Sequence, residues 1–298
     1  MLTDNPIGYW RLNELSGTTA IDAVGAHNGA YASAATEGAA GPRPPLFAGF
    51  ESTNAGVQTV GGTANSFVSV PFGSLSTNTV TFVAWVYPVG TQDGRAGLLF
   101  TRGNGVSGGM GYNGQMLSYT WNNNSSATYN FASGLTIPSN QWSLVALVIY
   151  PDKAILYLAN TNGLFSATNA IAHTPDVFGN NWQIGHDNNS GNNNGTRNFN
   201  GTIDEVAVFT RSISSDRIAA YYQAGITSGV AVTNGVVSPA GLRFTSIWVG
   251  DAQVVLQWLG NGTLEEAAVL EGPWTVSANQ NNPSVLPIAP AKFFRLRQ

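Results

Sequence analysis

A predicted strand that leads directly into one short helix constrains the fold of this chain more than any other feature. Residues 202–209 alternate between two sets of side chains, which is the pattern of a strand within a sheet. Ile203, Ala207 and Phe209 would share one face of this strand, and Asp204 would lie on the other. A strand that ends in a single closing helix indicates the end of a domain, so we expect a second unit to follow.

The helix after this strand has recognisable signals at both ends. Ser214 is a good N-cap, and Asp216 lies in the first turn, where the helix dipole favours an anion. Ile213 and Ile218 occupy the two positions of a hydrophobic staple. Gly225 is placed to cap the C-terminus. We therefore predict one short helix between the N-cap and this glycine.

Short apolar segments separated by turn signals fill most of the remaining chain. Turns rich in Gly, Asn or Pro, such as 103–105 and 151–153, recur between candidate strands. Many antiparallel strands at short spacing predict an all-β fold, an antiparallel jelly-roll sandwich. The composition agrees, because 35 Gly suit many turns and a hydrophobic content of 43% is enough for a core.

The distribution of these segments predicts two domains. We expect a β-sandwich over residues 1–226, followed by a linker over residues 227–241 that is rich in small and polar residues. A second, small β domain would occupy residues 242–298, near the lower size limit for independent stability.

Four motifs carry a resemblance to a known family: YWRLNE at 9–14, TFVAWV at 81–86, QWSLVA at 141–146 and GTIDEVAVF at 201–209. In this order they look like the laminin-G-like domains of the concanavalin A-like lectin/glucanase superfamily. The likeness covers residues 5–226. It implies a jelly-roll fold that hosts lectins, adhesins, protein-binding modules and hydrolases, so it says more about fold than about function.

The C-terminal region carries a second resemblance, and both bear on localisation. Trp258, the GPW of 272–274 and the FFRL of 293–296 resemble C-terminal modules of large secreted bacterial proteins. Residues 1–6 have neither the basic nor the apolar region of a signal peptide. Either the protein is cytoplasmic, or Met1 opens a piece of a longer secreted chain. The low charge and the lectin-like resemblance favour the second, so we expect an extracellular or cell-surface location.

Charge and cysteine content exclude several function classes. Charged residues make up only 9% of the chain, the net charge is −4 and the 12 Lys and Arg residues are scattered, so nucleic acid and anionic membranes are poor partners. The apolar run 144–150 is far shorter than the ~20 residues of a membrane span, so we expect no membrane insertion. Because the chain has no Cys, disulfides, thiolate metal sites and a Cys nucleophile are excluded.

Catalysis is not the function that the sequence favours. Glycanases of the resembled superfamily place two carboxylates on one strand face, as in Glu-x-Asp-x-Glu, and no such motif occurs here. The pairs Asp204-Glu205 and Glu265-Glu266 are neighbours and would point to opposite faces. A carboxylate pair from two distant strands stays open as an alternative. We therefore predict that the protein is not an enzyme.

The resemblance also implies a calcium ion, because related laminin-G-like domains often carry one that ties the N-terminal region to the last strand. The matching oxygen donors would be Asp22, Asn28 and Asp204, with Glu14 as an outside candidate. The alternative is that Asp22 caps a turn and Asp204 hydrogen-bonds a neighbouring loop. The amide-rich loop 186–200 is a weaker ion candidate, since it lacks the closing Glu of an EF-hand.

Carbohydrate binding is predicted from aromatic and amide side chains that gather in the middle of the chain. Exposed aromatic faces contact sugar C–H groups, and amides hydrogen-bond the hydroxyls. The candidate ligand-binding residues are Tyr112, Tyr119, Trp121, Asn123 and Trp182. An aromatic stripe at period two is also the pattern of a sandwich interior, and that alternative stays open.

Together these observations predict a non-catalytic module that binds an extracellular polysaccharide or other glycan, as one domain of a larger secreted or surface protein. Two alternatives remain. The first is an adhesion or structural module that binds protein or acts as a spacer. The second is a glycoside hydrolase or lyase with unusual catalytic positions.

Overall fold

The computed structural model describes residues 1–72, 75–103, 106–122, 124–179, 182–188, 196–227, 243–250, 253–259, 262–287 and 292–297. The chain divides into two compact units, Met1–Gly229 and Val230–Gln298. The predicted linker over 227–241 lies outside the described residues, apart from Thr227. No helix within the described residues is long and apolar enough to cross a membrane.

The larger sheet of the first unit runs in the order β14-β13-β12-β8-β17-β5-β4, with β1 added beside β17. In that order the strands are Gly163–Asn169, Lys153–Asn160, Ser143–Tyr150, Val80–Pro88, Gly201–Phe209, Ala55–Thr59 and Thr36–Ala40, and β1 is Gly8–Trp10.

The second sheet runs in the order β11-β10-β9-β16-β6-β3-β2. Its strands are Met116–Thr120, Val106–Asn113, Gly97–Gly103, Trp182–Ile184, Val68–Val70, Gly29–Tyr31 and Thr19–Ala20. Smaller elements complete the unit: the pair β15 (Asp176–Phe178) and β7 (Leu75–Thr77), a 3₁₀ turn Leu2–Asp4, a π-helical turn Ser125–Tyr129 and helix α1 (Ser215–Ile226).

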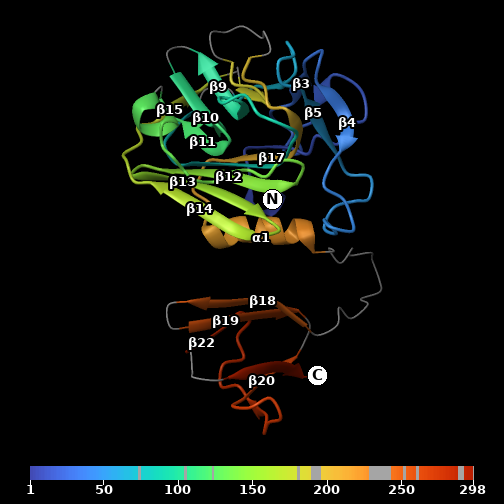
Figure 1. Cartoon of the computed structure of the whole chain (residues 1–298), viewed down its shortest axis with the longest axis vertical. Coiled ribbons are helices and arrows are strands. Elements are labelled where there is room, and N and C mark those ends of the chain that lie inside the picture. Colours follow the sequence, from blue (N-terminus) through green and yellow to red (C-terminus); the bar gives the residue numbers. More distant parts are fainter. Residues whose placement is uncertain are drawn as a thin grey trace. The chain divides into compact units, whose positions relative to one another are not determined.

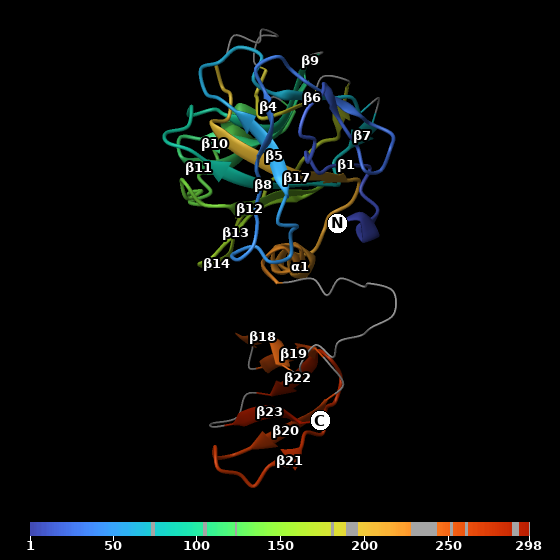
Figure 2. The ribbon, with the colours of Figure 1, turned by 90° about the vertical axis from the view of Figure 1, so that its right-hand side faces the viewer.

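These elements form three layers, with the second sheet, the larger sheet and α1 stacked in that order (Figures 1 and 2). The main hydrophobic core lies between the two sheets, where the Phe82 and Trp182 ring centroids are 5.3 Å apart. A second core lies between the larger sheet and α1, where Trp85 stacks on Tyr222 at 5.4 Å. Because every described strand pairing is antiparallel, the prediction of an all-β jelly-roll sandwich is confirmed.

Strand β17 contains a bulge that the alternating sequence pattern does not predict. Its register with β8 shifts between Asp204 and Ala207, and Glu205 has a φ of 51°. As a result Ile203 and Val206 both lie in the core between the sheets, whereas Ala207 lies in the core beneath α1. The prediction that Ile203 and Ala207 share a face is wrong, because the bulge resets the alternation.

Helix α1 begins as predicted and ends differently. The Ser214 side chain accepts a hydrogen bond from the Arg217 backbone N–H, which confirms the N-cap. The predicted C-cap, Gly225, lies inside the helix, and Thr227 is the capping residue. Gly225 is needed for close packing, since a Cβ there would lie 2.5 Å from the Trp85 ring.

The second unit has two small antiparallel sheets. One has the order β18-β19-β22, formed by Arg243–Gly250, Gln253–Leu259 and Ser284–Pro287. The other has the order β21-β20-β23, formed by Thr275–Val276, Thr263–Ala267 and Phe293–Arg297. The core of the second unit contains Leu256, Trp258, Leu264 and Leu286.

Replacing Gly225 by Ala sets helix propensity against packing. Propensity favours Ala by about 1 kcal/mol, but a methyl group forced against a rigid ring in a packed core costs about 1–3 kcal/mol. We expect Gly225→Ala to lower the Tm measured by differential scanning fluorimetry. Gln223→Ala changes an exposed position of the same helix and should leave the Tm nearly unchanged. A higher Tm for Gly225→Ala would contradict the packing argument.

Candidate functional site

A pocket of about 380 Å³ opens on the face of β9, β10 and β11 that points away from the core. Small residues line part of it: Ser107 and Gly111 on β10, and Ser118 on β11, which pairs with Gly111. The residues between these positions, such as Met110, point into the core instead. Strand alternation therefore places Met110 in the core and Gly111 and Ser118 on the pocket side, next to larger lining residues such as Phe100.

One wall of the pocket is an ion-pair cluster centred on Asp187, which is only 3% exposed. Arg102 donates to both Asp187 oxygens, through Nε and, at 2.8 Å, through Nη2. Arg197 Nη1 donates to Oδ2 at 2.8 Å. Both oxygens of this carboxylate are therefore held by guanidinium groups, and its lone pairs are committed to fixing the arginines.

Asp187 and Arg197 are ten residues apart in the sequence, and backbone pairing brings them together. His186 forms an isolated β-bridge with Asn198, and the Asp187 N–H donates to the Arg197 carbonyl at 3.3 Å. This paired segment lies tight against β9, where a Cβ at Gly97 would be 2.4 Å from the Asp187 backbone nitrogen. A glycine at this position is therefore what lets the cluster approach the sheet.

Another part of the lining contains Arg95 and Tyr129. The Arg95 guanidinium carbon lies 5.3 Å from the centroid of the Tyr129 ring, which is a cation–π distance. The Tyr129 hydroxyl donates to the Gly94 carbonyl at 3.1 Å, so the ring is tied to the chain that carries Arg95. This wall offers an aromatic ring and a cation side by side.

The predicted aromatic residues do not form an exposed platform. Trp121 and Tyr119 are each 1% exposed, Tyr112 is 3% exposed and Trp182 is fully buried. The expectation of exposed ring faces is therefore wrong for all four, because the stripe lies on the core side of the sheet. Tyr112 and Tyr119 still belong to the pocket lining. Asn123 lies outside the described residues.

Hydrogen bonds show what two of these buried rings do. Trp121 Nε1 donates to the Thr174 carbonyl at 2.7 Å, which anchors the segment before β15. The Tyr119 hydroxyl lies 2.9 Å from His173 Nε2 and accepts from Asn169 Nδ2 at 2.8 Å. Both rings therefore serve as structural contacts of the sandwich interior. This role matches the alternative interpretation of the period-two pattern, an aromatic stripe that faces the core.

Two of the three predicted calcium donors hold a turn. The Asp22 carboxylate accepts backbone N–H groups of Tyr9, Val24, Ala26 and His27 at 2.8–3.2 Å. The Asn28 side-chain carbonyl accepts the Asp22 N–H at 2.9 Å. Both groups are thus satisfied by the polypeptide, and they do not need a cation to offset their burial.

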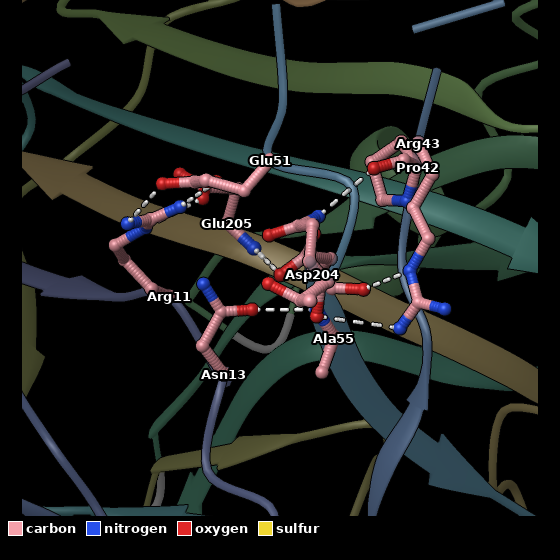
Figure 3. A network of polar contacts seen from close by, with 10 residues as sticks. Arg11, Asn13, Pro42, Arg43, Glu51, Ala55, Asp204 and Glu205 are labelled. Atoms are coloured by element: carbon pink, nitrogen blue, oxygen red, sulfur yellow. Dashed lines mark hydrogen bonds and ion pairs between the residues drawn. The ribbon is translucent and has the colours of Figure 1, made fainter. Parts of the chain in front are cut away.

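Asp204 has a different environment, in a network of polar contacts around β17 that also includes Arg11, Arg43 and Glu205 (Figure 3). It is fully buried, and burial raises the pKa of its carboxyl to about 8. Its Oδ2 accepts from Asn54 Nδ2 at 2.7 Å, while the buried Asn54 Oδ1 has no hydrogen-bond partner. Asp204 Oδ1 accepts the Glu205 backbone N–H at 2.9 Å, so each Asp204 oxygen already has one donor, and the Asn54 oxygen beside them is the unpartnered hard donor of the kind that Ca²⁺ takes.

Sequence reasoning does not identify the charged residues of the pocket: Arg95, Arg102, Asp187 and Arg197. One signal could have found two of them. Charged side chains are rare in this chain, so Arg102 in an otherwise uncharged strand and Arg197 in an amide-rich loop stand out. Their meeting point depends on the pairing of distant strands.

Neutralising Asp187 should destabilise the first unit. Asp187→Asn keeps the shape but removes the charge that pairs with Arg102 and Arg197, and breaking such a buried pair costs on the order of 3 kcal/mol. We expect a lower midpoint in urea unfolding. Asp152→Asn makes the same change at an exposed turn and should have little effect. Equal midpoints for both variants would contradict the stabilising role of the ion pairs that Asp187 forms with Arg102 and Arg197.

Comparisons with solved structures find several proteins that are similar to this chain at low sequence identity. Domain 4 of AbnA, a GH43 extracellular arabinanase from Geobacillus stearothermophilus solved with arabinotriose, is 15% identical over 72% of this chain and 97% of that one, with a TM-score of 0.45. A Trypanosoma rangeli sialidase is 14% identical, with a TM-score of 0.50. The match covers 72% of this chain and only 32% of the sialidase.

The binding domain of botulinum neurotoxin serotype G is 12% identical over 98% of this chain and 65% of that one, with a TM-score of 0.51. A search of curated proteins finds no match. The sequence profile described as the concanavalin A-like lectin/glucanases superfamily matches residues 61–219, more than half of the chain. With the antiparallel sandwich described above, this match shows that the chain belongs to the concanavalin A-like lectin/glucanase superfamily.

Proposed function

We propose that the chain is a non-catalytic carbohydrate-binding module of a larger extracellular or cell-surface protein. The observation that carries this proposal is the pocket over β9, β10 and β11. Its volume of about 380 Å³ falls within the range of small-molecule sites. A pocket of this kind takes one or two sugar units of a polysaccharide.

The lining offers what a sugar needs. Hydroxyl groups of a sugar both donate and accept, and the exposed Asn130 amide supplies a matching group. The Thr120 and Ser118 hydroxyls lie deeper in the lining, and Ser118 already donates to the Tyr129 carbonyl at 3.3 Å. The partly exposed ring of Tyr129 supplies an apolar surface for sugar C–H groups. Polar contacts would fix orientation, and the ring would add buried apolar area.

The same lining favours binding over hydrolysis. Glycoside hydrolysis uses two carboxyl groups, one that donates a proton and one that acts as nucleophile or base. Among the described residues, Asp187 is the carboxyl group that lines this pocket, and its two oxygens already accept from Arg102 and Arg197. Oxygens that are committed to two guanidinium groups are not free to contact a bound sugar as general acid, base or nucleophile.

A calcium ion at Asp204 is the second part of the proposal. The ion would be held by the Asp204 carboxylate and the Asn54 amide oxygen, together with backbone carbonyl groups of the neighbouring loop. When bound, it would supply positive charge that offsets the burial of this carboxylate. It would hold the loop before β5 against β17 and would thereby stabilise the folded first unit.

Glycan binding is tested with a panel of soluble and insoluble polysaccharides, by pull-down and by isothermal titration calorimetry. We expect at least one polysaccharide to bind, and Tyr129→Ala to weaken it about tenfold through loss of the ring contact. Tyr150→Ala is the matched control, because Tyr150 also carries a cation over its ring, from Lys153, and lies on the larger sheet. It should bind like the unmodified protein.

Binding to no polysaccharide on the panel would contradict the proposed function and would favour the adhesion or spacer alternative. Equal weakening by Tyr129→Ala and Tyr150→Ala would show that the pocket over β9–β11 is not the site. Circular dichroism of each variant checks that loss of binding is not loss of folding.

Calcium removal gives an independent test. EDTA should lower the Tm of the unmodified protein, and added Ca²⁺ should restore it, because the ion binds only the folded state. Asp204→Asn should abolish this response, whereas Asp22→Asn should retain it. An unchanged Tm in EDTA would contradict calcium binding at Asp204.

A further inference from the structure

The pocket concentrates positive charge in a chain that is otherwise poor in charge. Arg95, Arg102 and Arg197 all line it, although the whole chain has 12 Lys and Arg residues and a net charge of −4. Among the described lining residues, Asp187 is the acidic group. Two positive charges therefore face the pocket without a lining carboxylate to balance them.

Asp187 orients two of these arginines. The side chains of Arg102 and Arg197 are 22% and 14% exposed, so they are partly withdrawn from water and held by the same carboxylate. Arg197 uses Nη1 for Asp187 and has four further N–H donors. Guanidinium groups fixed in this way lose little conformational freedom when an oxyanion binds.

Arg95 is the arginine best placed to take up a new negative charge. It is exposed, and no ion pair joins it to a carboxylate within the described residues. The nearby Asp93 carboxylate accepts the Arg95 backbone N–H at 2.8 Å, and the guanidinium instead lies over Tyr129. This guanidinium stands beside the ring that the proposed function assigns to sugar contact.

A local effect must be responsible for any attraction of polyanions, because the net charge of the chain is negative. At physiological ionic strength charges are screened beyond about 8 Å, so contacts within the pocket outweigh the distant acidic residues. Arginine forks also bind carboxylate and sulfate oxygens in bidentate geometry, which neutral hydroxyls do not match.

We propose that the pocket selects glycans that carry an oxyanion, a uronate carboxylate or a sulfate ester, on the sugar unit that enters it. This inference rests on the proposed function and deepens it. The oxyanion would lie among Arg95, Arg197 and Arg102, and the sugar ring would contact Tyr129. Neutral polysaccharides would bind more weakly or not at all.

The test compares polymers that share a backbone and differ in charge. Polygalacturonate is paired with its methyl ester, which removes the carboxylate charge, and dextran sulfate is paired with dextran. Binding is measured by calorimetry at low and at raised ionic strength, together with the neutral polysaccharides of the panel. We expect at least one charged polymer to bind at least tenfold more tightly than its neutral counterpart, and raised salt to weaken that binding.

Substitutions at Arg95 localise the effect. Arg95→Gln should weaken binding of the charged polymer about tenfold, and Arg95→Lys should recover part of it, because the charge returns without the fork. Lys153→Gln removes the same charge from β13 of the larger sheet, whereas the pocket opens on the second sheet, and it should leave binding unchanged. Since Arg95 is exposed, neither Arg95→Gln nor Arg95→Lys should disturb folding.

The outcomes separate this inference from the proposed function. Preference for polygalacturonate identifies a carboxylate as the recognised group, and preference for dextran sulfate identifies a sulfate. Binding of neutral polysaccharides that equals that of both charged polymers, with no effect of Arg95→Gln, would overturn the inference and leave the proposed function standing. Equal losses in Arg95→Gln and Lys153→Gln would overturn it as non-specific charge attraction. Binding of no polymer would overturn both.

Discussion

Burial of strand β17 on both faces is the constraint on which the rest of the first unit depends. Every residue of Gly201–Phe209 is buried, with the core between the sheets on one side and α1 on the other. Its two acidic residues are tolerated there because Asn54 donates to Asp204 at 2.7 Å and Arg11 donates to Glu205 at 2.9 Å. The central strand thus needs specific polar partners from the N-terminal region, and the first and last strands of the unit are joined through them.

The second sheet meets a different demand, because its outer face carries the candidate site. The same strands send large rings such as Tyr119 into the core and small residues such as Gly111 and Ser118 outward. A pocket can form there without weakening the packing underneath. The charged residues that line the pocket come largely from chain segments at the strand ends. In the proposed function they form one wall of the glycan-binding pocket.

Sequence reasoning predicted the sandwich and the N-cap at Ser214, and it mistook buried rings for a binding surface. The physical reason is that a period-two pattern shows which residues share a face and not which face is buried. Trp121 and Tyr119 satisfy the pattern equally well on either side of the sheet, and the structure places them inside. The bulge at Glu205 was not predicted for a similar reason, because one added residue does not change the composition of the strand.

The sequence by itself determined the fold class, because alternating apolar segments, turn residues and one capped helix are local properties that act wherever the chain goes. Tertiary structure alone decided the site. Arg102 on β9, Asp187 after β16 and Arg197 ten residues further along meet because β16 pairs with β9 and because His186 bridges to Asn198. Pairing between strands so distant in sequence is selected by burial of the whole sheet, which no local pattern records.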